Sequence, residues 1–188
     1  TQADRIATAI ASNGNLGELH TLILQSEDLG LKGFQAFEKS RILHSVRRLE
    51  LQLTDDGSYS TRAIQHLVGA LNSSSLTALS LAGGKIKDAG VRHLGKAPVS
   101  LRELNLSTCE LSEKGIRALL SGLDGSQMER LILSRNPIGD EGLAAICEAD
   151  LPQLKQLVVD RCGVTNAGLK PLASAPFSKN LQWLDVSD

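Results

Sequence analysis

The sequence has few aromatic residues and almost no excess of charge. Phe, Tyr and Trp make up 3% of its 188 residues, there is one Trp, and the formal net charge is -1. A near-zero net charge provides no general attraction for nucleic acid or for an anionic membrane. No apolar stretch reaches the length of a membrane span. The sequence therefore predicts neither a nucleic-acid partner nor a membrane partner, and a core that is mainly aliphatic.

Instead, the sequence contains a recurring segment, which residues 128–146 represent well (MERLILSRNPIGDEGLAAI). Its first part alternates apolar and polar residues as a strand does. Asn, Pro and Gly then interrupt this alternation, and Leu143 and Ile146 follow at helical spacing. The segment recurs from residues 19, 46, 76, 101, 128, 154 and 181. Residues 4–11 (DRIATAIA) are consistent with the helix of one more copy. A period of 25 to 30 residues indicates a solenoid.

The segment resembles the leucine-rich repeat, whose pattern is L-x-x-L-x-L-x-x-N/C-x-L. The helical part, with Ile138, Gly142, Leu143 and Ile146, is similar to the ribonuclease-inhibitor-like subtype. The resemblance implies an α/β leucine-rich-repeat solenoid, or horseshoe, with a concave parallel β-sheet and convex helices. Residues 1–188 would form a single domain. Because the chain begins at Thr1 and not at Met, we expect this domain to be a piece of a longer array.

Two positions of the repeat carry structural expectations. The position that follows the strand needs a side chain that satisfies backbone groups no longer paired by the sheet. It is occupied by Glu27, Thr54, Gly84, Cys109, Asn136 and Cys162, among which Gly84 has no side chain to offer. A second position, inside the helix, is occupied by glycine at 33, 90, 115, 142 and 168. We expect that a Cβ atom there would crowd the neighbouring repeat.

The three cysteines are an odd number, and two of them lie at equivalent positions. Cys109 and Cys162 are two repeats apart, hence on the order of 10 Å from each other, which is too far for a disulfide. We expect them to be free thiols, and Cys147 to follow the helix of its repeat without a partner. Reduced buried cysteines favour a cytoplasmic location, either in the cell's own cytosol or in that of a host that receives a delivered effector.

No arrangement of residues predicts catalysis, a cofactor or a metal. His66 and His93 share one helical position in adjacent repeats and could face each other on the convex surface. No Cys, Asp or Glu recurs there to complete a metal site, so solvated surface histidines are the better interpretation. The segment LAGGK at 81–85 lacks the phosphate-loop pattern. The acidic residues at helix starts suit capping and the helix dipole.

The candidate site is on the predicted concave face, where equivalent side chains of successive strands form columns about 4.8 Å apart. Its C-terminal part combines Trp and Arg, which are enriched at interface hot spots, with exposed β-branched residues. The predicted partner-binding residues are Arg130, Ile132, Arg135, Val158, Arg161 and Trp183. The centre, at Ala78, Ser80, Ala82 and Gly83, is expected to be small and flat. The alternative is that these residues are solvated surface, with Trp183 contacting a further repeat.

These observations predict a non-catalytic protein–protein interaction module that binds a protein partner, of unknown identity, through its concave face. One alternative is a regulator of a small GTPase, as the resemblance to the Ran GTPase activators implies. Another is a structural spacer in a larger receptor, ligase or bacterial effector. The chain ends in a strand (LQWLDVSD) with nothing after it to cover the apolar layer, so we expect Leu181, Trp183 and Leu184 to be exposed. Self-association through this edge would follow.

Overall fold

The computed structural model describes residues 1–26, 28–53, 57–72 and 74–187. Glu27 and Thr54, two of the residues expected after the strands, and Asp188 lie outside the described residues. Within the described part, seven parallel strands form one sheet in the order of the sequence. The strands are β1 (Thr21–Ser26), β2 (Arg48–Leu53), β3 (Ala78–Ser80), β4 (Glu103–Asn105), β5 (Arg130–Ile132), β6 (Gln156–Val158) and β7 (Trp183–Asp185).

The strand register confirms the predicted columns. Every strand begins two residues after the predicted start of its repeat, so all seven repeats are in phase. The register pairs Arg130 with Gln156 and Gln156 with Trp183, and it pairs Ile132 with Val158. Side chains that share a place in the repeat therefore lie side by side across the whole sheet.

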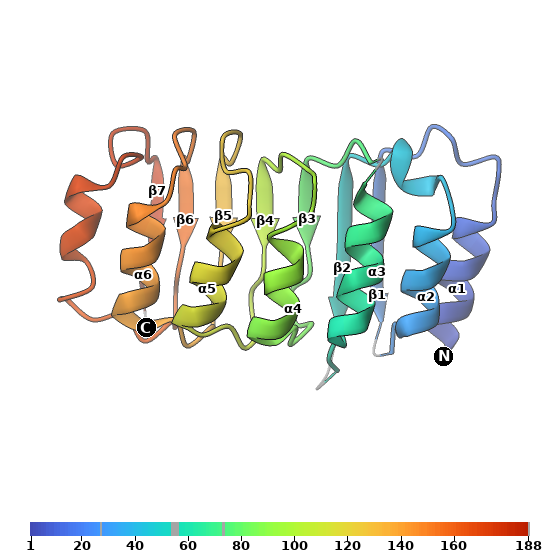
Figure 1. Cartoon of the computed structure of the whole chain (residues 1–188), viewed down its shortest axis with the longest axis horizontal. Helices are drawn as coiled ribbons and strands as arrows, with labels where there is room; N and C mark the ends of the chain where they lie inside the picture. Colours follow the sequence, from blue (N-terminus) through green and yellow to red (C-terminus); the bar gives the residue numbers. More distant parts are fainter. Residues whose placement is uncertain (27, 54–56, 73, 188) are drawn as a thin grey trace.

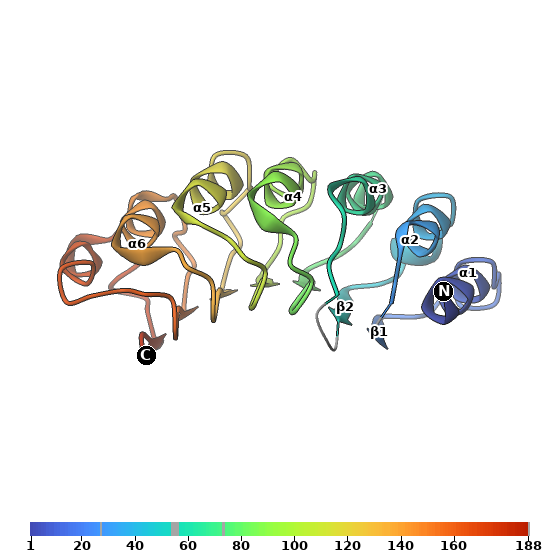
Figure 2. The same ribbon diagram turned by 90° about the horizontal axis from the view of Figure 1, so that it is seen from below.

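Helices pack on one face of the sheet and leave the other face open. They are α1 (Gln2–Ala11), α2 (Leu31–Glu38), α3 (Thr61–Leu71), α4 (Lys87–Leu94), α5 (Glu113–Leu120) and α6 (Gly139–Glu148), with 3₁₀-helices η1 (Ile42–His44) and η2 (Lys170–Ser174). The strands run along the back of the view in Figure 1, behind the helices. Figure 2 shows an arc with the helices outside and the strands along the inner face. The predicted α/β solenoid with a concave sheet is thus confirmed.

The last complete repeat, by analogy with the others, was expected to contain an α-helix, but the structure has the short 3₁₀-helix η2 there. Pro171 lies in its first turn and has no backbone N–H to donate. Ala175, which precedes Pro176, has the extended ψ of 139° that a residue before proline favours. The two prolines therefore limit the helix to a few residues.

The core is a continuous apolar layer between the sheet and the helices. Leu106 and Leu133 occupy equivalent apolar positions of two repeats and are both fully buried, as are Leu104 and Leu131. Phe34 and Phe37 of α2 also belong to this core. Since each repeat contributes one slice of the layer, burial depends on the neighbours on both sides, as in other solenoids.

Asn136 shows how the residue after the strand holds two repeats together. It is fully buried, and its Oδ1 accepts hydrogen bonds from the backbone N–H groups of Cys109 and Leu111, both at 3.0 Å. Its Nδ2 donates to the carbonyl oxygens of Leu106, at 2.8 Å, and Leu133, at 2.7 Å. The predicted role, satisfying backbone groups that the sheet leaves unpaired, is confirmed at this residue.

The cysteines are free and buried, as predicted. In the position equivalent to Asn136, the Cys109 thiol contacts the Leu81 carbonyl oxygen at 3.3 Å, and the Cys162 thiol contacts that of Leu133 at 3.2 Å. Cys147 does not follow its helix but lies within α6, because that helix continues to Glu148. Burial raises the pKa of the Cys109 thiol to about 12.

The recurring glycines make room for contacts between repeats at some positions only. A Cβ atom on Gly115 would meet the carboxylate of Asp88, and one on Gly168 would meet that of Asp140, each in the preceding repeat. At Gly142 the expectation is wrong, because the nearest atom belongs to Ile138 of the same repeat. The carboxylate of Asp140 occupies the space beside Gly168. There it accepts hydrogen bonds from the backbone N–H of Thr165 at 2.6 Å and from the Thr165 hydroxyl at 2.7 Å.

Candidate functional site

The C-terminal part of the concave face brings together four of the six predicted site residues. Trp183 on β7 is 60% exposed. It lines a hollow of about 350 Å³ together with Arg130 of β5, and the Gln156 side chain of β6 lies between them in the register. Ile132 and Val158 are paired neighbours in the next column. A large exposed aromatic ring beside an arginine and a branched apolar pair is an arrangement typical of a protein contact surface.

Arg135 and Arg161 lie apart from these four residues. They follow the strands by three residues, in turns where their φ angles are 57° and 51°. Gly83 and Thr108 have the same place in their repeats and also have positive φ, 78° and 56°. From the third repeat to the sixth, this place is therefore a row of left-handed turn residues at the strand-exit edge of the sheet, whereas the equivalent Ser26 and Leu53 end strands β1 and β2. The two arginines are exposed and lie at that edge of the concave face.

The centre of the concave face is hollow, so the prediction of a small flat surface is wrong. Ala78 and Ser80 of β3 are short, while the residues on both sides are long. Arg48 of β2 reaches across β3 and donates a hydrogen bond of 2.6 Å to Glu103 of β4. This bond, with a smaller contribution from Glu50, raises the pKa of Arg48 above its ordinary value. The space below is about 190 Å³ and is also lined by Arg130, which is 3.6 Å from the Glu103 carboxylate.

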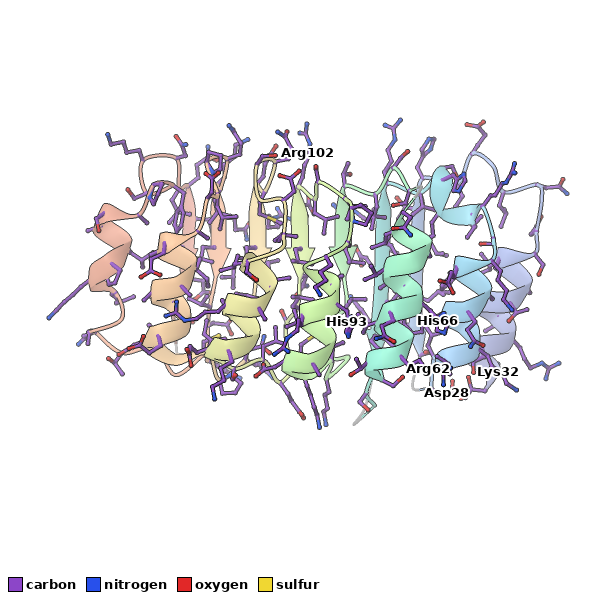
Figure 3. The ribbon with its side chains drawn as sticks, viewed as in Figure 1. Asp28, Lys32, Arg62, His66, His93 and Arg102 are labelled. Atoms are coloured by element: carbon purple, nitrogen blue, oxygen red, sulfur yellow. The ribbon has the colours of Figure 1, made fainter. Side chains whose placement is uncertain are left out.

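A row of residues that the predicted columns omitted borders the same face. It is made by the residue before each strand: His20, Arg47, Thr77, Arg102, Glu129, Lys155 and Gln182. Each residue of the row after His20 donates its backbone N–H to the carbonyl oxygen of the previous one, over 2.7 to 2.9 Å. The strand-entry row, as we call it, thus continues the ladder of the sheet, and Figure 3 shows Arg102 at this edge.

Charges in the strand-entry row are distributed unevenly. Glu129 binds Arg102 at 3.0 Å and Lys155 at 2.9 Å, and the hydrogen bond from Lys155 is the main cause of the lowered pKa of Glu129. Arg47 has no ion-pair partner among the described residues. The sequence contains a signal for this row, since each member directly follows the first apolar residue of its repeat.

The two histidines of the convex face were expected to be solvated surface residues, but both are half-buried and contact side chains of the preceding helix. Figure 3 shows them on the neighbouring helices α3 and α4. His66 contacts Glu38 of α2 through Nδ1 at 2.5 Å, and His93 contacts Gln65 of α3 at 3.2 Å. Each ring therefore lies against the helix before its own. Among the described residues, no group of three or more His, Cys, Asp and Glu side chains could hold a metal ion.

No helix in the described part of the chain combines the length and the apolar character needed to cross a membrane.

Comparisons with known proteins agree with the repeat. A family model described as "Leucine Rich repeat" matches residues 72–95, 98–120 and 128–147. Ribonuclease inhibitor from Mus musculus is 32% identical over 195 aligned residues, which cover 97% of this chain and 41% of the relative. "NACHT, LRR and PYD domains-containing protein 5" from Homo sapiens is 36% identical over 120 residues, or 60% of this chain and 10% of the relative.

A solved structure shares the fold. A chain in the yeast complex of Rad7 and Elc1 aligns with 98% of this chain and 52% of its own length, at a TM-score of 0.58 and 17% sequence identity. The present chain spans less than half the length of the mouse and human relatives. The in-phase strands, the convex helices and the similarity to the inhibitor over nearly the whole chain lead to one assignment. The chain is a leucine-rich repeat protein of the ribonuclease-inhibitor-like type.

Proposed function

We propose that the chain is a non-catalytic protein-interaction module that binds a protein partner through the concave face near its C-terminal end. Trp183 is the central residue of this surface, with Arg130, Ile132 and Val158 around it. Arg135 and Arg161 would contact the partner from the strand-exit edge. The observation that carries the proposal is the 60% exposure of Trp183 on a hollow lined by charged and polar side chains.

The expected contribution of Trp183 can be worked out from its exposure. A tryptophan side chain has roughly 250 Å² of surface at most, so 60% exposure leaves about 150 Å² for a partner to cover. At about 25 cal/mol per Å², covering it would contribute roughly 3–4 kcal/mol to binding. This is the range of an interface hot spot. Replacing Trp183 by alanine should therefore weaken binding roughly 100- to 1,000-fold.

The relatives support an interaction role. One is named as an inhibitor of a ribonuclease, a function carried out on another protein. The absence of catalysis is part of the proposal, because hydrogen bonds and ion pairs within the fold account for the polar clusters described above. We further propose that residues 1–188 form one domain, which the unbroken sheet from β1 to β7 supports.

A site-specific photo-crosslinker tests the proposal. Placed at Gln156, between Arg130 and Trp183, it should capture a partner from a lysate of the source cells, to be identified by mass spectrometry. The same group at Arg92 on the convex helix α4 is the control. Trp183→Ala should abolish capture from position 156, and purified partner should then bind the parent protein but not this variant. Equal capture from position 92, or capture that Trp183→Ala leaves unchanged, would contradict the proposal.

We also propose that the chain is located in the cytosol and that two copies associate through the β7 edge. The three free, buried cysteines support a cytosolic location. Trp183 and Leu184 are 60% and 44% exposed, as expected, and support association of two copies through the β7 edge. Light scattering over a concentration series tests this association, since a mass that stays that of a monomer at every concentration would exclude it.

A further inference from the structure

The concave face has a second polar region over β3, which shares Arg130 and Ile132 with the proposed contact around Trp183 and otherwise has its own residues. Two adjoining hollows meet there, of about 190 and 270 Å³, and both are lined by Arg48 and Glu103. The first extends along β3 to Ser80, and the second extends to Arg47 and Arg102 of the strand-entry row. We call the two together the β3 hollow. They exist because Ala78 and Ser80 are short, so the long side chains of β2 and β4 surround an open space.

The β3 hollow carries an excess of positive charge. Its arginines are Arg47, Arg48, Arg102 and Arg130, and its carboxylates are Glu50 and Glu103. Four cations against two lining carboxylates leave two positive charges in excess, although one of the cations, Arg102, also binds Glu129, which does not line the hollow. Glu103 engages Arg48 and Arg130, while Arg47 has no ion-pair partner among the described residues. Guanidinium groups can donate several hydrogen bonds in one plane, so donors remain available here.

Ser80, at the floor of the β3 hollow, provides an independent observation. Its side chain is 7% exposed, and its hydroxyl has no hydrogen-bond partner among the residues that the structure describes. A buried hydroxyl without a partner is unfavourable for folding, and most buried polar groups in proteins are satisfied. The Ser80 hydroxyl lies on a hollow open to solvent and can therefore donate to a group that enters from outside.

We propose that the β3 hollow binds acidic side chains of a protein partner. One carboxylate would accept from the Ser80 hydroxyl and the guanidinium groups of Arg48 and Arg130. A neighbouring carboxylate would bind Arg47 and Arg102 at the strand-entry row. This inference rests on the proposed function, because it takes the concave face as the binding surface and adds the chemical class of the partner.

The composition of the hollow favours carboxylates over other anions. The hollow has two separate sets of guanidinium groups, Arg48 with Arg130 and Arg47 with Arg102, and two neighbouring acidic side chains can present one carboxylate to each set. A single-stranded nucleic acid binds through several aromatic side chains on which successive bases stack, and none of the residues lining the hollow is Phe, Tyr or Trp. An acidic stretch of polypeptide satisfies both constraints.

The test uses N- and C-terminally blocked hexaglutamate as the probe and follows the backbone amide signals of the ¹⁵N-labelled protein. We expect the shifts to concentrate at residues 47–50 and 78–81 and to decrease as salt is added. Blocked hexaglutamine should cause no such shifts. Inorganic pyrophosphate should bind more weakly than hexaglutamate, and tighter binding of pyrophosphate would overturn the carboxylate assignment.

Three variants make the test specific. Ser80→Ala should weaken hexaglutamate binding about tenfold, yet leave the melting temperature of the free protein unchanged or raise it, because the hydroxyl has no partner there. The double variant Arg47→Gln, Arg102→Gln should weaken binding by at least fivefold. Arg92→Gln, the same change on exposed α4, is the control and should have no effect.

Several results would overturn the proposal. The titration would do so if millimolar hexaglutamate caused no shifts, or caused them away from residues 47–50 and 78–81. The variants would do so if Arg92→Gln weakened binding as much as the double variant, or if Ser80→Ala bound hexaglutamate as the parent does. Trp183→Ala should leave hexaglutamate binding unchanged, whereas it should abolish capture of the partner from position 156. A failed hexaglutamate titration with that capture intact would therefore refute this inference alone, without refuting the proposed function.

Discussion

Replacing Asn136 by alanine removes a single side chain on which four backbone groups of two repeats depend. The variant would lose two hydrogen bonds accepted from Cys109 and Leu111 and two donated to Leu106 and Leu133. Because Asn136 is fully buried, water cannot replace these bonds without entering the core. The consequence should be local loosening at the junction of the β4 and β5 repeats, and a lower free energy of unfolding for the whole array.

The magnitude follows from the number of groups left without partners. A net contribution of about 0.5–1.5 kcal/mol for each bond, and a cost of about 1–3 kcal/mol for each buried group left unpaired, set the scale. Partial relaxation reduces the sum, so we expect a loss of about 4 kcal/mol in the free energy of unfolding. Since folded domains are stable by only about 5–15 kcal/mol, such a loss is readily measured.

Urea denaturation followed by circular dichroism measures this loss, and the slope with urea shows whether unfolding remains cooperative. Asn136→Cys is the matched control, because Cys109 and Cys162 occupy the same place in their repeats and their thiols contact a carbonyl oxygen. It should be intermediate in stability, because a thiol can replace one donated bond and its sulfur is only a weak acceptor for the two backbone N–H groups, as at Cys109 with Gly84 and Ile86. If alanine cost less than about 1 kcal/mol, or if cysteine were the worse substitution, the reasoning would be refuted.

Three further predictions concern other parts of the fold. Burial raises the pKa of the Cys109 thiol to about 12, so this thiol should stay unmodified by a thiol reagent at neutral pH and react fully after denaturation. Rapid labelling of Cys109 in the folded protein would contradict its buried position. The backbone hydrogen bond from Thr165 is the main cause of the lowered pKa of Asp140. The ionised carboxylate should therefore stabilise the fold at pH values above the ordinary aspartate pKa of about 3.9. This stabilisation should be lost as the pH falls through the lowered pKa of Asp140. The difference in melting temperature between the parent and Asp140→Asn should therefore shrink in acid. Leu133→Asp would bury an unpaired charge and should lose several kcal/mol in chemical denaturation, whereas melting like the parent would mean that its inward orientation is wrong.

The sheet could be predicted from the sequence because two periods act together. Side chains alternate between the faces of a strand, and the repeat places the same alternation in every strand. The fully buried Leu106 and Leu133 follow from the first period, and the pairing of Ile132 with Val158 follows from both. A register error of one residue would have turned every leucine to the solvent. The columns were therefore strongly determined by the residues alone.

The site was harder to predict, because it depends on where long side chains extend. Arg48 and Ala78 are neighbours in one column, and the sequence indicates only that one is long and the other short. The structure shows that Arg48 passes over Ala78 to reach Glu103, two strands away. That path creates the hollow where a flat surface was predicted. The contact of His66 with Glu38 has the same origin, since it joins side chains from different positions on adjacent helices.

The hollow beside Trp183 and the β3 hollow are both lined by Arg102, Glu103 and Arg130. Among these residues, Arg130 connects the two regions. It lines the hollow beside Trp183 and also lies 3.6 Å from Glu103, which holds Arg48 over the β3 hollow. A partner that engages both regions has to present acidic side chains over β3 and an apolar surface over β7. With four strand spacings of about 4.8 Å between those strands, the two parts of the partner have to be roughly 19 Å apart. Glu103 binds the guanidinium groups of both Arg48 and Arg130. Acidic groups of a partner would compete with Glu103 for these two guanidinium groups. A partner that draws Arg130 toward Trp183 would leave Glu103 bound to Arg48 alone. Binding at one region should therefore change the affinity of the other, and comparing hexaglutamate affinity with and without a purified partner bound at Trp183 measures that coupling.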